Sequence, residues 1–195
     1  MRPAEGVTPR VAAAMAGQPR ARFLPRRARL QAGRDGPLAI GHGQTNSQPR
    51  TVAAMLDLLD VHPGHRVLDV GSGSAWTTAL LAELVGPDGS VLGVERVPEL
   101  VEVGRANLAR TGLSRAVIRA ADPHVLGAPD DAPFDRVLVS AMATRLPDTL
   151  VDQLAPGGVL VVPVDGVMTR VVLDERRGTT VTEHGRYLFV PLVGG

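Results

Sequence analysis

Apolar residues recur at regular helix and strand spacings from residue 36 onward. In segment 51–60, Val52, Met55, Leu56 and Leu59 fall at i, i+3, i+4 and i+7, which predicts the apolar face of an amphipathic helix. Further helices are predicted over residues 77–85, 99–111 and 150–154, where Gly or Pro residues mark the ends. Shorter apolar runs separate these helices and are the candidate strands.

These runs are rich in Val, Leu and Ile, as strands of a buried sheet are. They cover residues 67–70, 91–95, 117–119, 135–140, 159–164, 168–173 and 187–190. The earlier strands alternate with helices, whereas the last ones follow one another closely. That order predicts an α/β fold with a mostly parallel sheet, an antiparallel edge and helices on both faces. No linker or repeat interrupts residues 36–195, which we expect to form one domain.

Residues 1–35 form an Arg- and Pro-rich N-terminal arm, which we expect to be loosely structured and only partly ordered. Its prolines leave room for at most a short helix around residues 10–17. Residues 1–34 hold eight Arg and one acidic residue (net +7), against 13 Arg and 19 acidic residues (net −6) over 35–195. The arm contains a basic run made of Arg20, Arg22, Arg26, Arg27 and Arg29. Either this run is a solvated surface or it contacts a partner.

The composition excludes several classes of protein. Without Cys, the chain has no disulfide framework, no thiol nucleophile and no Cys-ligated metal, and we predict no metal site. The near-neutral total charge of +1 makes a nucleic-acid partner unexpected, although a basic arm keeps it open. The longest apolar run, residues 11–17, is far shorter than the about 20 residues of a membrane span. The bracketing Pro9 and Pro19 argue against a secretory signal, so we expect a soluble, cytoplasmic protein.

A glycine-rich turn follows the first strand of the predicted domain. Gly71 and Gly73 let the backbone turn tightly and approach a ligand where a Cβ would clash. Glu95 ends the next strand, where its carboxylate can accept hydrogen bonds from two ribose hydroxyls. These residues predict a nucleoside site at the carboxyl ends of the strands. The plainer alternative is an ordinary strand-to-helix turn beside a solvated Glu95.

The nucleoside is better explained as S-adenosylmethionine (AdoMet) than as a dinucleotide. A dinucleotide fingerprint needs a third glycine, where this chain has Trp76. Asp69, two residues before Gly71, would repel a pyrophosphate but could hold the ammonium group of AdoMet. Asp122 follows the third strand, where a carboxylate can accept from the adenine amine, unless it is simply solvated. The pattern therefore favours a methyltransferase over a dehydrogenase.

Residues 41–49 (GHGQTNSQP) are similar to the G-x-G-Q-T-x-S-x-P segment of the protein-L-isoaspartate O-methyltransferase family. The resemblance covers residues 7–193, nearly the whole chain. Its other landmarks are segments 7–11, 19–25, 35–40, 95–100, 155–158 and 189–192. It implies a Rossmann-like, AdoMet-dependent methyltransferase sheet. The chain departs from the family pattern at Ala75, at Pro123, and at Leu188, where relatives often have Arg.

The resemblance also implies an activity and a set of site residues. The methyl group of AdoMet would be transferred to the α-carboxylate of L-isoaspartyl residues in damaged proteins or peptides, a protein-repair reaction. Ser47 would be the active-site hydroxyl, with Thr45 able to orient the same carboxylate. The implied AdoMet contacts are Asp69, Gly71, Ser72, Gly73, Glu95, Arg96 and Asp122. Without the resemblance, Thr45 or Ser47 would be interpreted as the N-cap of the helix over 51–60.

A carboxylate acceptor explains why the sequence offers no obvious catalytic base. With a pKa of about 4 the acceptor is already ionised at neutral pH, so none of the five His needs a catalytic role. The enzyme has to align the reacting atoms and exclude water. Three alternatives stay open: methylation of another carboxylate such as a peptide aspartate, a non-catalytic AdoMet- or partner-binding domain, and a nucleic-acid methyltransferase.

Overall fold

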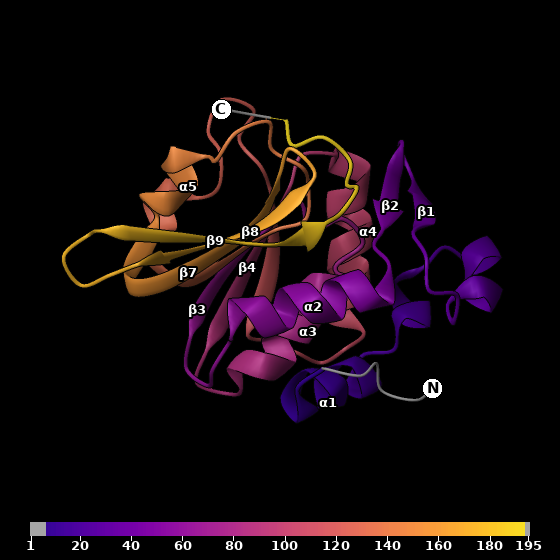
Figure 1. Ribbon diagram of the computed structural model, residues 1–195. Helices are drawn as coiled ribbons and strands as arrows, with labels where there is room; N and C mark the ends of the chain where they lie inside the picture. Colours follow the sequence, from indigo (N-terminus) through magenta and orange to yellow (C-terminus); the bar gives the residue numbers. More distant parts are fainter. Residues whose placement is uncertain (1–6, 194–195) are drawn as a thin grey trace.

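The computed structural model describes residues 7–193, and Figure 1 shows their course. The helices are α1 (Pro9–Gly17), α2 (Pro49–Leu59), α3 (Trp76–Val85), α4 (Pro98–Ala109) and α5 (Asp148–Val151), with 3-10 helices η1 (Arg20–Phe23), η2 (Arg26–Gln31) and η3 (Pro129–Asp131). The strands are β1 (Leu38–Gly41), β2 (Gln44–Asn46), β3 (Arg66–Val70), β4 (Ser90–Glu95), β5 (Ala116–Ala120), β6 (Phe134–Val139), β7 (Leu154–Val164), β8 (Val167–Leu173) and β9 (Thr179–Arg186).

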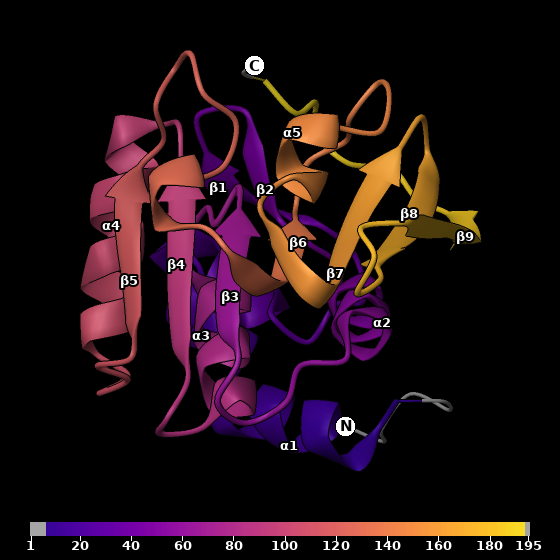
Figure 2. The same cartoon turned by 90° about the vertical axis from the view of Figure 1, so that its left-hand side faces the viewer.

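Seven strands form the central sheet in the order β5-β4-β3-β6-β7-β8-β9. Strands β3 to β7 run parallel to one another, whereas β8 pairs antiparallel with β7 and β9 pairs antiparallel with β8, which confirms the predicted sheet. The chain runs outward from β3 through β4 to β5 and then returns to β6 on the other side of β3. Ligands of such sheets bind at the carboxyl ends of the strands where this reversal occurs. These ends lie toward the top of Figure 2.

Helices cover both faces of the sheet, as the sequence predicts. Helices α2, α3 and α4 pack on one face, and the single-turn α5 packs against β7 on the other. Successive strand residues alternate between two apolar cores, because side chains of a strand point to opposite faces. Val67 and Val91 belong to the core under the long helices, and Leu68 and Leu92 to the opposite one.

Two sequence-based expectations about elements are wrong, and the β1–β2 hairpin was not predicted. Residues 187–190 form no strand; the last strand is β9, whose exposed, mostly polar residues carry no apolar alternation. The helix expected over 150–154 is shorter and earlier (α5), since Leu154 already begins β7. The small hairpin of β1 and β2, on which residues 41–49 lie, is an element that the sequence analysis did not predict.

The N-terminal segment packs against the sheet's helical layer. Helix α1 lies on α3, and Val11 and Phe23 are buried in the same core as α3. Arg20 is also buried, at 5% exposure, so the expectation of a solvated basic run is wrong for this residue. Residues 1–6 and 194–195, included above in the arm and the domain, lie outside the described residues.

Within residues 7–193, no helix combines the length and apolar content that crossing a membrane requires. Over the same residues, no group of three or more His, Asp or Glu side chains gathers where it could hold a metal ion.

Candidate active site

The glycine-rich turn connects β3 to α3 at the point where the strand order reverses. Gly71 and Gly73 have φ of +79° and +53°, a backbone region that favours glycine. A Cβ on Gly73 would lie 3.2 Å from Cδ1 of Ile40 in the β1–β2 hairpin. Glycine therefore allows both the tight turn and the close approach of the hairpin.

Glu95, at the end of β4, connects this turn to the next one. Its Oε2 accepts a hydrogen bond from the Gly73 amide at 2.9 Å, and its Oε1 accepts from the Val97 amide at 2.9 Å. Each carboxylate oxygen has further lone-pair capacity, so Glu95 can still accept from a ligand. Its side chain is 5% exposed and lines the main cavity of the site.

The main cavity has a volume of about 430 Å³, within the usual range of small-molecule pockets. Its walls are the β1–β2 hairpin, the glycine turn, the end of β4, the loop after β5 and residues 190–193. The predicted residues that line it are Thr45, Gly71, Gly73, Glu95, Arg96 and Asp122. Asp122 is exposed, and its Oδ1 accepts from the His124 amide at 2.7 Å, which fixes the loop after β5.

Asp69 does not line this cavity, because its side chain is completely buried beneath the glycine turn. Its Oδ2 accepts hydrogen bonds from the hydroxyls of Thr77 and Thr78 at 2.8 and 2.7 Å, which ties β3 to the start of α3. Its Oδ1 has no hydrogen-bond partner among residues 7–193. Burial raises the pKa of Asp69 to about 6; the Thr78 and Thr77 hydrogen bonds oppose this shift, and the Glu95 charge adds to it. Asp69 thus supports the turn from below and is not part of the cavity wall.

Ser72 lies within the glycine-rich turn, between Gly71 and Gly73, and lines a space that hairpin residues also line. It is 4% exposed, and in the described part of the chain its hydroxyl has no hydrogen-bond partner. It lines a small cavity of about 30 Å³ together with Thr45, Ser47 and Ser140. This volume matches about one water molecule.

Thr45 and Ser47 lie on β2 and just after it, and neither caps α2. The N-cap of α2 is Gln48, which makes no side-chain capping bond. Within residues 7–193, no hydrogen bond involves the Thr45 or Ser47 hydroxyl. The capping alternative is therefore wrong, and both hydroxyls are free to bind a ligand.

A further cavity of about 240 Å³ lies on the other side of these hydroxyls. Thr45 and Ser140 line both this cavity and the main one, so the two meet there. The lining residues are all uncharged: Pro37, Thr45, Ser47, Gln48, Thr51, Ser140, Leu188, Phe189 and Val190. Leu188 is 93% exposed at this cavity. We call it the uncharged cavity.

Ser140, which directly follows β6, was missed by the sequence analysis. It lines the main, the small and the uncharged cavity. The signal available in the sequence was its place at the end of the strand over 135–140. Its significance depends on β6 lying beside β3, which a strand list alone does not reveal.

Buried Arg20 holds the hairpin in place. Its Nε donates to the Asn46 side-chain oxygen at 2.7 Å, and its Nη2 donates to the Asn46 and Gly36 carbonyls, both at 2.8 Å. A fourth bond joins Nη1 to the Arg34 carbonyl at 3.0 Å. Burial lowers the Arg20 pKa to about 10, a shift that the Asp35 charge opposes, so the guanidinium stays charged at neutral pH. Because Asn46 lies between Thr45 and Ser47, these bonds fix the segment that carries both hydroxyls.

Ala75 shows what one departure from the family pattern means for the backbone. The replacement of Gly by Ala is free of strain only where φ is negative, yet Ala75 has φ of +74°. An L-residue in this left-handed region costs about 1–2 kcal/mol. Ala75 is completely buried at the start of α3, so the turn is maintained against this strain.

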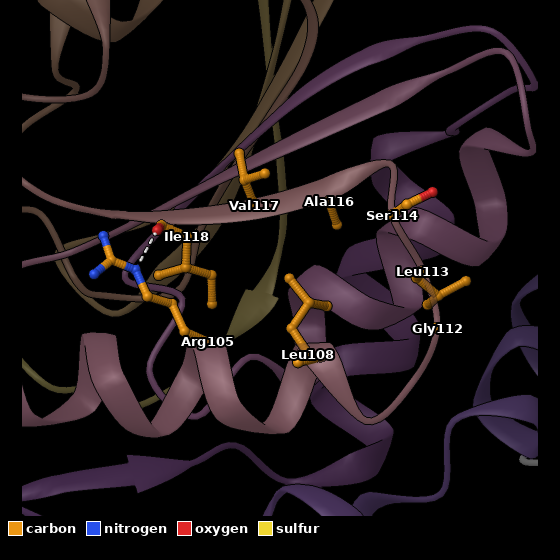
Figure 3. A pocket seen from close by; sticks show the side chains of 9 residues that line it. Arg105, Leu108, Gly112, Leu113, Ser114, Ala116, Val117 and Ile118 are labelled. Carbon is orange, nitrogen blue, oxygen red and sulfur yellow. Dashed lines mark hydrogen bonds between the residues drawn. The ribbon is translucent and has the colours of Figure 1, made fainter.

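Another hollow lies between α4 and β5, shown in Figure 3. Apart from Arg105 and Ser114, its lining is apolar or glycine, and Arg105 donates to the Ile118 carbonyl at 2.9 Å. It contains none of the predicted site residues. The predicted site residues therefore lie around the cavities at the carboxyl ends of the strands and not in this hollow.

The family model described as Protein-L-isoaspartate(D-aspartate) O-methyltransferase matches residues 3–195. The protein-L-isoaspartate O-methyltransferase of Methanopyrus kandleri is 47% identical over 189 residues, which cover 95% of this chain and 84% of that protein. A Plasmodium falciparum structure of the same description, in complex with S-adenosyl-L-homocysteine, is 27% identical with a TM-score of 0.80 and covers 95% of this chain and 90% of its own.

A further solved protein-L-isoaspartate O-methyltransferase has a TM-score of 0.86 and 25% identity over 97% of this chain. It is a longer protein, of which this chain spans 62%. Members of the matched family are AdoMet-dependent methyltransferases. The chain belongs to the protein-L-isoaspartate(D-aspartate) O-methyltransferase family.

Proposed function

We propose that this enzyme transfers the AdoMet methyl group to the α-carboxylate of L-isoaspartyl residues in damaged proteins or peptides. The observation that carries the proposal is the position of Thr45 and Ser47. Thr45 lines both the cavity that Glu95 lines and the uncharged cavity that opens beside Leu188, and Ser47 lines the uncharged cavity. A cofactor on one side and a peptide carboxylate on the other would meet at these hydroxyls.

The main cavity suits AdoMet. Glu95 offers acceptor sites for ribose hydroxyls, Asp122 can accept from the adenine amine, and Ala121 and Leu126 supply apolar wall. The unpartnered Ser72 hydroxyl, beside the turn, is available to the methionine part. When bound, AdoMet supplies a methyl group that the carboxylate oxygen takes as the carbon–sulfur bond breaks, leaving a methyl ester and S-adenosylhomocysteine.

Ser47 and Thr45 would hold the substrate carboxylate by hydrogen bonds from neutral hydroxyls. Such donors orient the carboxylate without cancelling its charge, so it remains a nucleophile. The lining of the uncharged cavity offers no cation that would stabilise the carboxylate before reaction. The apolar side chains of Leu188, Phe189 and Val190 would exclude water, which favours a reaction that joins opposite charges.

The test is methyl transfer from labelled AdoMet to two synthetic peptides that differ only in isoaspartate or aspartate at one position. Base-labile label on the isoaspartyl peptide alone supports repair methylation. Label on the aspartyl peptide instead would favour another carboxylate as the acceptor. If neither peptide is labelled, the proposal fails, and cofactor binding in a parallel titration then shows whether the chain still uses AdoMet.

The Ser47→Ala variant tests the role of its hydroxyl. We expect kcat/KM for the isoaspartyl peptide to fall about tenfold or more, since a hydrogen bond to a charged group is lost. Affinity for S-adenosylhomocysteine should stay within about twofold of wild type, well under the 1.4 kcal/mol of a tenfold change. Ser114→Ala, the same change at an exposed serine near the opposite end of the sheet, is the control (Figure 3). A parallel loss of both parameters would assign Ser47 a structural role.

We also propose that isoaspartyl proteins or peptides, and not nucleic acids, are the partners of this enzyme. The guanidinium of Arg20 donates its hydrogen bonds to groups inside the protein, and Arg29 donates to the Leu24 carbonyl at 3.1 Å. Binding of RNA or DNA that weakens steeply with added salt would contradict this proposal.

A further inference from the structure

We propose that Ser140 is a third hydroxyl that binds the substrate carboxylate, from the wall opposite Thr45 and Ser47. This inference rests on the proposed function. It adds to that function a substrate-binding residue on the sheet itself, where the hydroxyls discussed so far come from the hairpin side.

The position of Ser140 is set by the sheet and not by a loop. Its amide donates to the Val70 carbonyl at 2.8 Å, so the backbone after β6 stays paired with the end of β3. A Cβ built on Gly71 would lie 3.9 Å from the Ser140 Cβ, in ordinary van der Waals contact. Ser140 therefore sits directly beside the glycine turn, at the reversal of strand order.

Thr45, Ser47 and Ser140 lie around one space. All three line the uncharged cavity of about 240 Å³. They also line the small cavity between hairpin and turn, together with Ser72, Ser74 and Thr77. Among residues 7–193 no side-chain hydrogen bond engages the Ser140 hydroxyl, as is also true of Thr45 and Ser47. Ser47 and Ser140 are half-buried and Thr45 is exposed, so all three hydroxyls remain available to a ligand or to water.

The arrangement fits a carboxylate better than other ligands. A carboxylate has two acceptor oxygens in one plane, and donors on opposite walls fix the direction of that plane. Thr45 and Ser47 alone would hold the carboxylate from the hairpin side only. Ser140 also lines the main cavity, so a carboxylate that it holds would face the cofactor side.

The inference requires that Ser140 recognise the charge of the substrate and not merely support the fold. The experiment compares wild type, Ser140→Ala and Ser140→Thr, which keeps a hydroxyl, with Ser114→Ala as the matched remote control. Measurements are kcat and KM for the isoaspartyl peptide at saturating AdoMet, S-adenosylhomocysteine affinity by calorimetry, and thermal unfolding. A second peptide carries a carboxamide in place of the isoaspartyl α-carboxylate, and its binding as an inhibitor is measured on each variant.

For Ser140→Ala we expect KM to rise about tenfold, as for the loss of a hydrogen bond to a charged group. The affinity for S-adenosylhomocysteine should stay within about twofold of wild type, and binding of the carboxamide peptide should be unchanged. Ser140→Thr should recover most of the loss. In the double variant Ser47→Ala/Ser140→Ala, the fold-loss of kcat/KM should be less than the product of the two single fold-losses, because the hydroxyls share one ligand.

Each contrary result has one meaning. If wild type methylates the isoaspartyl peptide and Ser140→Ala leaves KM unchanged, the inference is wrong and the proposed function stands. Equal weakening of carboxylate and carboxamide peptides would assign Ser140 a structural role and also overturn it. If wild type methylates no isoaspartyl peptide, the proposed function fails and the inference fails with it.

Discussion

At the scale of single residues, Asp69 is the most unusual group of the site. It is a carboxylate that folding removes completely from water, and one of its oxygens has no partner within residues 7–193. Burial raises its pKa from 3.8 to about 6. The folded chain therefore keeps a proton that the unfolded chain has already lost over this interval. Stability from Asp69 is fully present below the unfolded pKa and is lost as the pH rises through about 6.

Asp69→Asn should remove this pH dependence while keeping an oxygen for Thr77 and Thr78. Relative to wild type, we expect the variant to gain stability between pH 4 and pH 7, by on the order of 3 kcal/mol for a shift of about two pKa units. Urea unfolding across this pH range measures the difference. Exposed Asp130→Asn is the control. A difference between Asp69→Asn and wild type that does not change with pH would show that Asp69 titrates normally.

Glu95 offers a second prediction, because its two oxygens hold backbone amides on both sides of the cavity. Glu95→Gln removes the charge and turns an NH₂ group toward one of those amides. We expect S-adenosylhomocysteine to bind more weakly by about 1–3 kcal/mol, measured by calorimetry. The exposed Glu175→Gln should bind as wild type does. Unchanged affinity in Glu95→Gln would remove Glu95 from the cofactor site.

At the scale of elements, the N-terminal segment and the hairpin act as one unit through Arg20. Lys in its place would keep the charge but could not match four acceptors with a planar group. We expect Arg20→Lys to lower the free energy of unfolding by on the order of 3 kcal/mol, seen as a lower urea midpoint at constant m-value.

The control for this change is Arg22→Lys, which alters an exposed residue of the same 3-10 helix. A midpoint equal to wild type in Arg20→Lys would mean that the hairpin stays in place without these hydrogen bonds.

The elements that the sequence predicted well are those with strong local patterns. The apolar face of α2 and the valine-rich strands β3 and β4 are visible because burial repeats at the period of the element. The β1–β2 hairpin was not predicted, since its position depends on Arg20, a residue 26 positions before Asn46. β9 was missed because an exposed edge strand has no apolar face to reveal it.

The same distinction applies to the site. Gly71, Gly73 and Glu95 follow from a motif that is continuous along the chain, and the structure brings them to one cavity. Asp69 was expected to contact the cofactor because of its place in that motif, but the depth of its burial depends on α3. Ser140 enters the site only through strand order. Site residues that belong to one continuous motif could be predicted from the sequence. A site residue whose position depends on which strands are neighbours in the sheet could not.

At the scale of the whole molecule, two segments far apart in sequence cover the carboxyl ends of the strands, where the main cavity lies. The hairpin of β1 and β2 covers it from one side, and residues 190–193 cover it from the other. The latter are attached by two backbone bonds of 2.7 Å, from the Met142 amide to the Val190 carbonyl and from the Leu192 amide to the Met142 carbonyl. A ligand in the main cavity would contact both segments.

Ligand binding should therefore slow amide hydrogen exchange in both segments together. With saturating S-adenosylhomocysteine, we expect protection over residues 38–47 and 187–193 as well as at the glycine turn, measured by mass spectrometry. Strand β9, on the far edge of the sheet, serves as the internal reference and should not change. Protection confined to the glycine turn and Glu95 would show that the two segments do not close over the ligand.

The attachment of residues 190–193 also matters for how the protein is made and handled. The ribosome adds these residues after every strand of the sheet has been synthesised, so the cavity gains this wall after the sheet itself. A chain trimmed by a protease after Arg186 would keep all nine strands and lose Leu188 to Val193 from the two large cavities. Such a product would also lose Tyr187, Phe189 and Leu192 from the margins of the two apolar cores, so intact mass should accompany every activity measurement.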